Sequence, residues 1–402
     1  MGELFRRFWL PAILPSELPD PDGPPIRIRL LSEDLVAFRD SEGRIGIVDA
    51  HCAHRGASLF FGRNEESGLR CVYHGWKFDV GGNCVDMPNE PAESNFKQKV
   101  HLTAYQAREW GGLVWVYMGP PDRTPELPQL EWARVPDSHR RVSKWLQDVN
   151  YAQCLEGEID TSHVSFLHSS LQPSTVPNKT TRPALMAKDR SPKLIMHNTD
   201  YGFLYGARRT VGEDSYYWRV TQWLMPTYSL IPSAEFPSGG RVWVPMDDEH
   251  TWSFSYSYHP ERPLTDSERA GIESGRSFPP ELIPGTFKPK RNIDNDYLID
   301  REDQRLRTFT GIYGINDQDR SMLDGMGPIV NRGNEHLGTT DTAIIMARLR
   351  LIKAARDLQK GIEPVAPQHG DMYRVRSLDV VASQDELDAL MAAYDSALTA
   401  HV

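Results

Sequence analysis

Two Cys-His pairs stand close together in the first part of the sequence. The first is Cys52-Ala53-His54, and sixteen residues later the second follows as Cys71-Val72-Tyr73-His74. Two thiolates and two imidazoles can hold one metal centre. That centre is either a tetrahedral zinc ion or a [2Fe-2S] cluster in which the cysteines bind one iron and the histidines bind the other. The ligand types alone leave both centres open.

The spacing within each pair favours the iron-sulfur cluster. Paired zinc ligands usually have about two to four residues between them, whereas Cys-x-His is tighter and places its ligands on opposite sides of a short loop. That arrangement suits two separate iron atoms. Neutral histidines remove negative charge from a cluster and raise its potential, so it accepts electrons from a flavin or ferredoxin donor. Cys84 and Cys154 lie outside both pairs and are interpreted as small apolar residues.

A second group of possible metal ligands lies in residues 156–168. His163 and His168 are five positions apart, and five residues turn an α-helix about 140° beyond a full turn. The two imidazoles could therefore bind one ion only at a helix end or a distortion, and a purely structural pair stays possible. Asp160, three residues before His163, can accept a hydrogen bond from the imidazole nitrogen that faces away from a metal. Two histidines and one carboxylate would form the facial triad of mononuclear Fe(II) oxygenases.

The residues around these groups carry a family resemblance. Arg55-Gly56 and Gly75-Trp76-Lys77-Phe78 resemble the flanks of Rieske cluster-binding loops, and Asp-x-x-His-x-x-x-x-His resembles the catalytic motif of the Rieske non-haem iron oxygenases. The resemblance covers nearly the whole chain. It implies a [2Fe-2S] cluster and a mononuclear Fe(II). The implied cluster ligands are Cys52, His54, Cys71 and His74, and the implied iron ligands are His163, His168 and a carboxylate.

The resemblance also assigns Asp160 and the third iron ligand. Asp160 would bridge electrons from a Rieske histidine, His74, of a neighbouring subunit to His163. Asp319 is the predicted third ligand, because an Asp followed five positions later by an acidic residue, here Asp324, is similar to the family's ligand segment. Asp317 is the alternative. Acidic residues at a helix N-terminus would explain the same segment without a metal.

Three C-terminal stretches look like the phthalate 4,5-dioxygenase branch of that family: residues 314–319, 326–329 and 335–341. This implies an aromatic-ring-hydroxylating dioxygenase component that uses O2 and takes electrons from an NAD(P)H-dependent flavin and iron-sulfur reductase. The implied substrate is aromatic, an aryl carboxylate, and the implied assembly is a homotrimer or a pair of trimers. A Rieske monooxygenase or O-demethylase is the alternative, and an electron-transfer protein without oxygenase chemistry is a distant one.

A carboxylated substrate predicts an arginine in the pocket, since a planar guanidinium binds a carboxylate through two hydrogen bonds. Arg208 and Arg209 follow a predicted strand at 201–207. Neighbouring residues on a strand face opposite sides, so at most one of them can enter the pocket. Two solvated side chains are the alternative interpretation.

The elements that position these residues predict an α+β fold in two domains. An all-β Rieske [2Fe-2S] domain occupies residues 1–118, with its core at about 26–117, and a Pro-rich connection follows at 119–136. A mononuclear iron catalytic domain occupies residues 137–402, with an antiparallel sheet flanked by helices. Predicted strands are 26–31, 35–39, 44–48, 113–117, 216–223 and 251–258. One helix is predicted over 341–360 and another after a capping box from Ser383 to Glu386.

Composition restricts the partners. The net charge of −10 argues against nucleic acid or an anionic membrane as the main partner, and 39% hydrophobic with 25% charged residues is typical of a soluble globular protein. No apolar run is long enough to span a bilayer, and charges interrupt the start where a signal peptide needs an apolar core. The sequence therefore predicts a cytoplasmic protein. Four cysteines are too few for a disulfide framework in a chain of this length.

Overall fold

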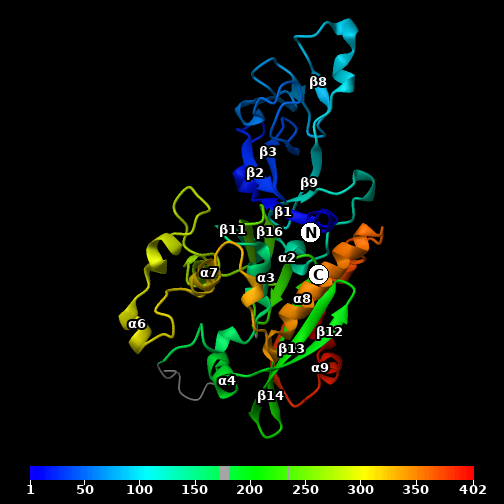
Figure 1. Ribbon diagram of the computed structural model, residues 1–402. Helices are drawn as coiled ribbons and strands as arrows, with labels where there is room; N and C mark the ends of the chain where they lie inside the picture. Colours follow the sequence, from blue (N-terminus) through cyan, green and yellow to red (C-terminus); the bar gives the residue numbers. More distant parts are fainter. Residues whose placement is uncertain (172–180, 234) are drawn as a thin grey trace. The chain divides into compact units, whose positions relative to one another are not determined.

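The computed structural model describes residues 1–171, 181–233 and 235–402 and divides into two compact units. One unit holds residues 2–125 and 244–247, and the other holds residue 1 with residues 126–243 and 248–402. In Figure 1 the first unit is largely blue to cyan and contains both Cys-His pairs, while the second is largely green to red and contains His163 and His168.

The first unit is built from two antiparallel sheets. The larger sheet has the strand order β1-β10-β9-β4-β3-β2, and the smaller has the order β5-β6-β7-β8. Every residue of β10 is buried, as expected for a run of β-branched, apolar and aromatic side chains. The bounds are α1 (Gly2–Phe5), β1 (Trp9–Ile13), β2 (Ile26–Leu30), β3 (Glu33–Arg39), β4 (Ile45–Asp49), β5 (Arg63–Glu65), β6 (Gly68–Arg70), β7 (Lys77–Phe78), β8 (Cys84–Asp86), β9 (Ala104–Trp110) and β10 (Leu113–Tyr117).

An eight-stranded sheet forms the centre of the second unit. Its strand order is β11-β17-β16-β15-β14-β13-β12, with β18 also paired to β14, and strand pairs such as β13 with β14 run antiparallel. This confirms the predicted fold class of an all-β domain followed by a larger domain with a sheet and helices. The bounds are β11 (Arg140–Gln147), β12 (Lys193–Thr199), β13 (Gly202–Gly212), β14 (Ser215–Leu224), β15 (Tyr228–Ile231), β16 (Ser238–Pro245), β17 (Thr251–Tyr258) and β18 (Leu378–Ala382).

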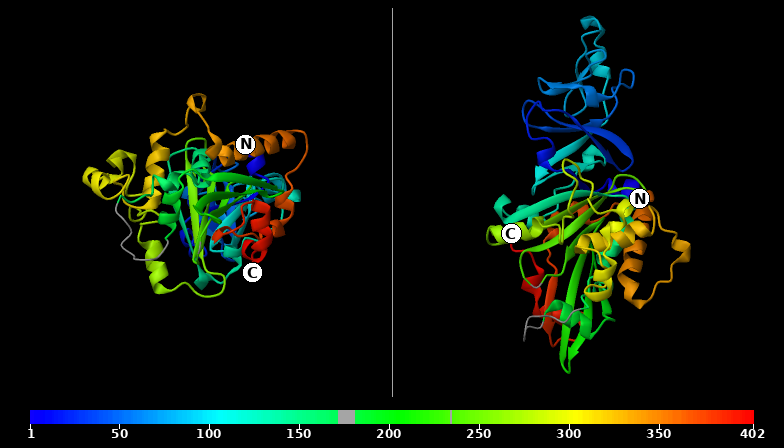
Figure 2. Two further views of the ribbon diagram at one scale, coloured as in Figure 1. Left: turned by 90° about the horizontal axis from the view of Figure 1, so that it is seen from below. Right: turned by 90° about the vertical axis from the view of Figure 1, so that its left-hand side faces the viewer.

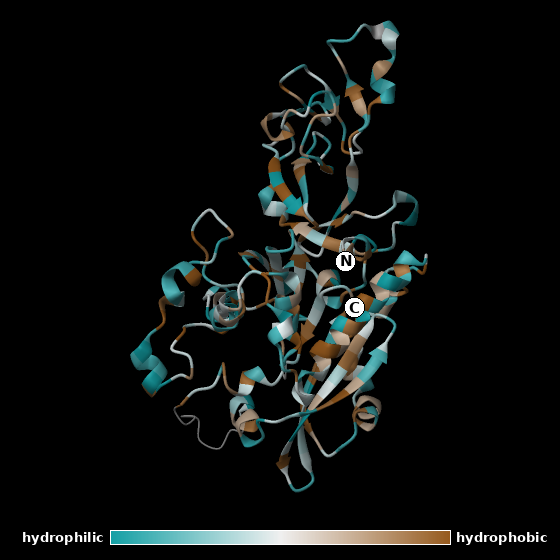
Figure 3. Ribbon diagram, in the orientation of Figure 1, coloured by the Kyte–Doolittle hydropathy of each residue, from teal (hydrophilic) through white to brown (hydrophobic). Residues whose placement is uncertain are grey.

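Helices flank this sheet. In Figure 1 and in the left view of Figure 2, the orange helix α8 runs beside the green strands β12 and β13, which it contacts. Figure 3 shows alternating hydrophilic and hydrophobic segments along α8, and its buried residues are Ala343, Ile344, Ala347 and Leu351. The bounds are α2 (Glu131–Arg134), α3 (Tyr151–Ile159), α4 (Arg182–Lys188), α5 (Asp266–Glu273), α6 (Arg301–Leu306), α7 (Ile315–Gly325), α8 (Thr342–Gln359), α9 (Leu387–Ala393) and α10 (Asp395–Leu398). Within the described ranges, no helix is both long and apolar enough to cross a membrane.

The predicted C-terminal capping box is wrong. Helix α9 begins at Leu387 with Glu386 at its N-cap, and no side chain caps it. The preceding turn is held in another conformation, because Trp218 Nε1 donates a 2.8 Å hydrogen bond to the carbonyl of Gln384 and the Arg208 guanidinium donates to the carbonyl of Asp385. Leu387, Leu390 and Leu398 are nevertheless buried in one apolar cluster with Trp218 and Val220 of β14.

Candidate metal centres and active site

Two loops with the same backbone pattern present the Cys-His pairs. The N–H of Cys52 donates to the Ala57 carbonyl at 2.8 Å, and the N–H of Cys71 donates to the Trp76 carbonyl at 2.8 Å. In each loop a glycine four residues after the cysteine, Gly56 or Gly75, returns a hydrogen bond to the cysteine carbonyl. Both glycines have a positive φ, +73° and +79°, which only glycine adopts at little cost. The sequence thus builds two equivalent turns, each of which presents one cysteine and one histidine.

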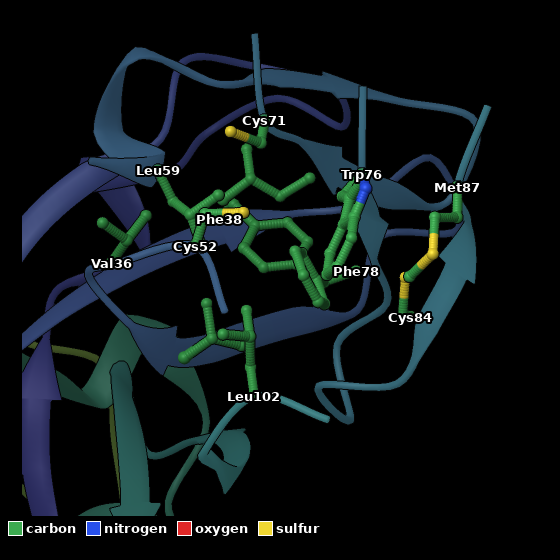
Figure 4. Close-up of a cluster of buried hydrophobic side chains, with 12 residues drawn as sticks. Val36, Phe38, Cys52, Leu59, Cys71, Trp76, Phe78, Cys84, Met87 and Leu102 are labelled. Carbon is green, nitrogen blue, oxygen red and sulfur yellow. The ribbon is translucent and has the colours of Figure 1, made fainter. Parts of the chain in front are cut away.

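The side chains of these loops fit a cluster. Cys52 and Cys71 are both 3% exposed and lie in one apolar cluster with Phe38 and Leu59 (Figure 4). Burial raises the pKa of Cys52 to about 11, and the neighbouring Cys71 raises it further. The His54 and His74 ring centroids are 4.4 Å apart, and the buried His54 Nδ1 has no hydrogen-bond partner in the part of the chain that the structure describes.

The same geometry disfavours one zinc ion. Zinc would need all four donors around one point. Among the described residues, only His163, His168 and Asp319 bring three possible ligand atoms within 4.8 Å of one another. The two Cys-His pairs do not form such a compact group. Cys84 and Cys154 are packed as small apolar residues: Cys84 lies beside Met87 (Figure 4), and Cys154 is fully buried.

A distorted helix end brings His163 and His168 together. Helix α3 ends at Ile159, and Asp160 turns the chain because its Oδ1 accepts hydrogen bonds from the Ser162 N–H at 2.7 Å and hydroxyl at 2.6 Å. His163 then begins a 3-10 turn. The Nε2 atoms of His163 and His168 lie 3.2 Å apart. The two imidazoles therefore meet because the backbone between them is irregular, as the five-residue spacing required.

Asp319 from α7 completes this group. Its Oδ1 lies 3.0 Å from His168 Nε2 and 3.5 Å from His163 Nε2. Asp317 lies elsewhere: it is buried, with its carboxylate 3.2 Å from Arg320 and 3.6 Å from Arg291. Asp324 accepts a hydrogen bond from Tyr297. Two imidazole nitrogens and one carboxylate oxygen thus face the same small space, a donor set that suits Fe(II).

The surrounding groups favour the ionised carboxylates of Asp319 and Asp160. Burial would raise the pKa of Asp319, but the neighbouring imidazoles of His168 and His163 and the guanidinium of Arg241 lower it. Burial likewise opposes ionisation of Asp160, and the His163 imidazole outweighs it and lowers the pKa. His163 Nδ1 lies 3.5 Å from Asp160 Oδ2. Asp160 is therefore a carboxylate on the side of His163 away from its Nε2.

A cavity of about 1240 Å³ opens onto these residues. Its lining includes Asp160, His163, His168 and Asp319 together with apolar side chains such as Phe278 and Ile315. An aromatic molecule fits a space of this size and mixed character.

Family comparisons match both parts of the chain. The Rieske [2Fe-2S] domain family matches residues 8–105, and the family described as LigXa C-terminal domain like matches residues 116–391. The phthalate 4,5-dioxygenase oxygenase subunit of Pseudomonas putida is 41% identical over 400 residues, covering 96% of this chain and 89% of that protein. The 3-chlorobenzoate-3,4-dioxygenase oxygenase subunit of Comamonas testosteroni is 40% identical over 390 residues, covering 93% and 89%.

The chain belongs to the Rieske oxygenase family. It is an oxygenase component, with a Rieske [2Fe-2S] cluster and a mononuclear Fe(II) as the family's cofactors. The fold agrees with solved structures. One is the QL mutant of NdmA from Pseudomonas putida CBB5 with theobromine. It matches with a TM-score of 0.62 at 19% identity, covering 89% of this chain and 93% of that one.

The arginines that line the cavity of this Rieske oxygenase differ from those predicted. Neither Arg208 nor Arg209 is among the lining residues. The arginines that do line the cavity are Arg182, Arg190, Arg219 and Arg241. Contacts away from the cavity hold both side chains on β13. Arg208 lies over the Tyr216 ring at 4.7 Å, and Arg209 is fully buried, donating to the Thr161 carbonyl at 3.0 Å.

The lining arginines are not equivalent. Arg182 lies 2.8 Å from the Asp379 carboxylate, and Arg241 is ion-paired with the buried Glu158. Arg190 is exposed, 5.3 Å from the Phe166 ring. Arg219 is half-buried on β14. In the described part of the chain it has no carboxylate partner: its NH1 contacts Met186 Sδ at 3.5 Å, and its Nε is buried without a partner. The sequence signal for it was a single charge inside the otherwise aromatic and β-branched strand β14.

Proposed function

We propose that this Rieske oxygenase hydroxylates an aryl carboxylate at an iron held by His163, His168 and Asp319. The observation that carries the proposal is the convergence of three ligand atoms on a cavity that also contains Arg219, which has no carboxylate partner among the described residues. The relatives named for phthalate and 3-chlorobenzoate support the same substrate class.

We assign the cluster to Cys52, His54, Cys71 and His74. This set is supported by two buried neighbouring thiols and by His54 Nδ1, which is buried with no partner within residues 1–171, 181–233 and 235–402. Trp76 stacks on His54 at 4.4 Å and donates its indole N–H to Asn89 at 2.6 Å, which fixes the imidazole plane. The predicted domain limits of 1–118, 119–136 and 137–402 belong to the same proposal.

The residues around the iron would divide the work. An Fe(II) bound by two histidines and one carboxylate supplies open positions for dioxygen activation. Arg219 would bind the substrate carboxylate through two charge-assisted hydrogen bonds. Phe278 and Ile315 would exclude water from the ring.

Asp160 would connect the two cofactors across a subunit boundary. Its carboxylate lies 3.5 Å from His163 Nδ1 on one side, and we propose that its other contact is His74 of a neighbouring chain in a homotrimer or a pair of trimers. The electrons would come from an NAD(P)H-dependent flavin and iron-sulfur reductase, and we propose that the protein acts in the cytoplasm.

A single-turnover experiment tests the function. The iron-loaded protein is reduced, and the excess reductant is removed. Aryl carboxylates and isotopically labelled dioxygen are then added, and the labelled oxygen atoms in the products are counted by mass spectrometry. Two labelled oxygen atoms in one product establish a dioxygenase. One labelled atom establishes the monooxygenase alternative, and an unlabelled phenol together with formaldehyde establishes the O-demethylase alternative. No product from any carboxylate, with product from uncharged aromatics, would contradict the substrate class.

A further inference from the structure

Gln318 contacts the side of His168 that faces away from the other two ligands. It precedes Asp319 on α7 and is 9% exposed. Its Oε1 lies 2.7 Å from His168 Nδ1, and its Nε2 donates a 2.9 Å hydrogen bond to the carbonyl of Ile312. One side chain thus connects a proposed iron ligand to the backbone of the preceding loop.

The Ile312 carbonyl determines how the Gln318 amide is oriented. A backbone carbonyl only accepts hydrogen bonds, so the NH2 group of Gln318 must face it. Oε1 must then face His168 Nδ1, and an amide oxygen is also only an acceptor. His168 Nδ1 therefore carries the hydrogen, and the lone pair of the neutral ring lies on Nε2. That nitrogen is the one 3.0 Å from Asp319 and 3.2 Å from His163 Nε2.

The loop that supplies this carbonyl is itself fixed. Gly311 has φ +70°, and a Cβ there would lie 2.2 Å from the Asp300 carbonyl. The Gly311 carbonyl accepts from the Asp300 N–H at 2.8 Å, and the Ile312 N–H donates to Thr310 Oγ1 at 3.1 Å. A buried, hydrogen-bonded loop holds Gln318 more firmly than a solvent-exposed one would.

We propose that Gln318 is a positioning residue that fixes the tautomer and ring orientation of His168 for iron binding. The inference rests on the iron site of the proposed function. His163 has the anionic Asp160 in the equivalent place, so the two histidines are held by different chemistry: a charged bridge for His163 and a neutral amide for His168. Partners of this kind commonly change metal affinity by about 10- to 100-fold when removed.

The test compares Gln318→Met with Gln318→Glu and with a matched control, Gln153→Met. Gln153 is also buried, and its amide also bonds two backbone groups, the Gly327 carbonyl and the Val330 N–H, both at 2.9 Å. It does not line the cavity. The readouts are the Fe(II) dissociation constant, by competition with a chelator, and the EPR spectrum of Co(II) in the mononuclear site with the cluster oxidised.

Gln318→Met should weaken Fe(II) binding by about 10- to 100-fold and change the Co(II) spectrum. Gln318→Glu keeps the acceptor and should restore most of the affinity. Gln153→Met should lower the Tm but leave the Fe(II) affinity and the spectrum unchanged. Wild-type affinity and spectrum in Gln318→Met, or an equal loss in both methionine variants, would overturn the inference. His168→Ala separates the two claims: if it too binds Fe(II) as wild type does, the iron site itself is assigned wrongly.

Discussion

Replacing Arg219 tests whether the cavity recognises a carboxylate. The guanidinium is half-buried, lines the cavity and contacts Met186 Sδ at 3.5 Å rather than an acid. A hydrogen bond to a charged group contributes about 1.5–3 kcal/mol. Two such bonds from a partly solvated arginine, discounted for screening, give about 2 kcal/mol in total. That corresponds to a roughly 30-fold weaker Kd in Arg219→Met.

The assay measures substrate Kd by calorimetry for an aryl carboxylate and for its methyl ester. Arg219→Met should weaken binding of the carboxylate and leave the ester nearly unchanged, whereas Arg219→Lys should recover part of the loss because it keeps the charge without the planar fork. Arg208→Met is the matched control, since Arg208 does not line the cavity. The reasoning is refuted if the carboxylate Kd rises less than about threefold, or if carboxylate and ester weaken equally.

Three further predictions concern the bridge, a buried ion pair and the core. Asp160→Asn should leave both metals bound but slow reoxidation of the reduced cluster in the presence of substrate by about 100-fold in stopped-flow absorbance; near wild-type reoxidation would sink its bridging role. Arg376→Met should lower the free energy of unfolding by about 3 kcal/mol, because it leaves the Glu131 carboxylate buried, and Glu131→Leu added to it should restore most of the loss in urea unfolding. Leu390→Ala should cost about 2–5 kcal/mol in the same measurement, while the exposed Val381→Ala should cost little; equal effects would contradict the packing described for α9.

The sequence predicted elements well where one pattern determines the outcome. The strands 113–117 and 251–258 agree with β10 and β17, because runs of β-branched and aromatic residues strongly favour strands. The helix predicted over 341–360 agrees with α8 to within one residue at each end. The capping box at Ser383 failed because hydrogen bonds from Trp218 and Arg208, distant in sequence, hold the turn before α9.

The site shows the same division. His163 and His168 could be paired from sequence because they lie five residues apart and their local turn brings them together. Asp319 could be chosen only by resemblance, since its approach depends on how α7 packs against α3. Arg219 and Gln318 were missed because the sequence pattern of a strand or helix does not reveal which polar side chain will line a cavity or contact a metal ligand. Arg208 and Arg209 were chosen by proximity to a strand end, which does not determine the depth of a side chain.

Iron and sulfide analysis tests the central claim, that one chain holds two separate iron centres. The wild-type chain should contain about three irons and two acid-labile sulfides. His168→Ala should lose about one iron and keep the cluster absorbance and sulfide, whereas Cys71→Ser should lose the brown colour and the sulfide. An unchanged iron content in His168→Ala, or a fully coloured Cys71→Ser protein, would contradict the account.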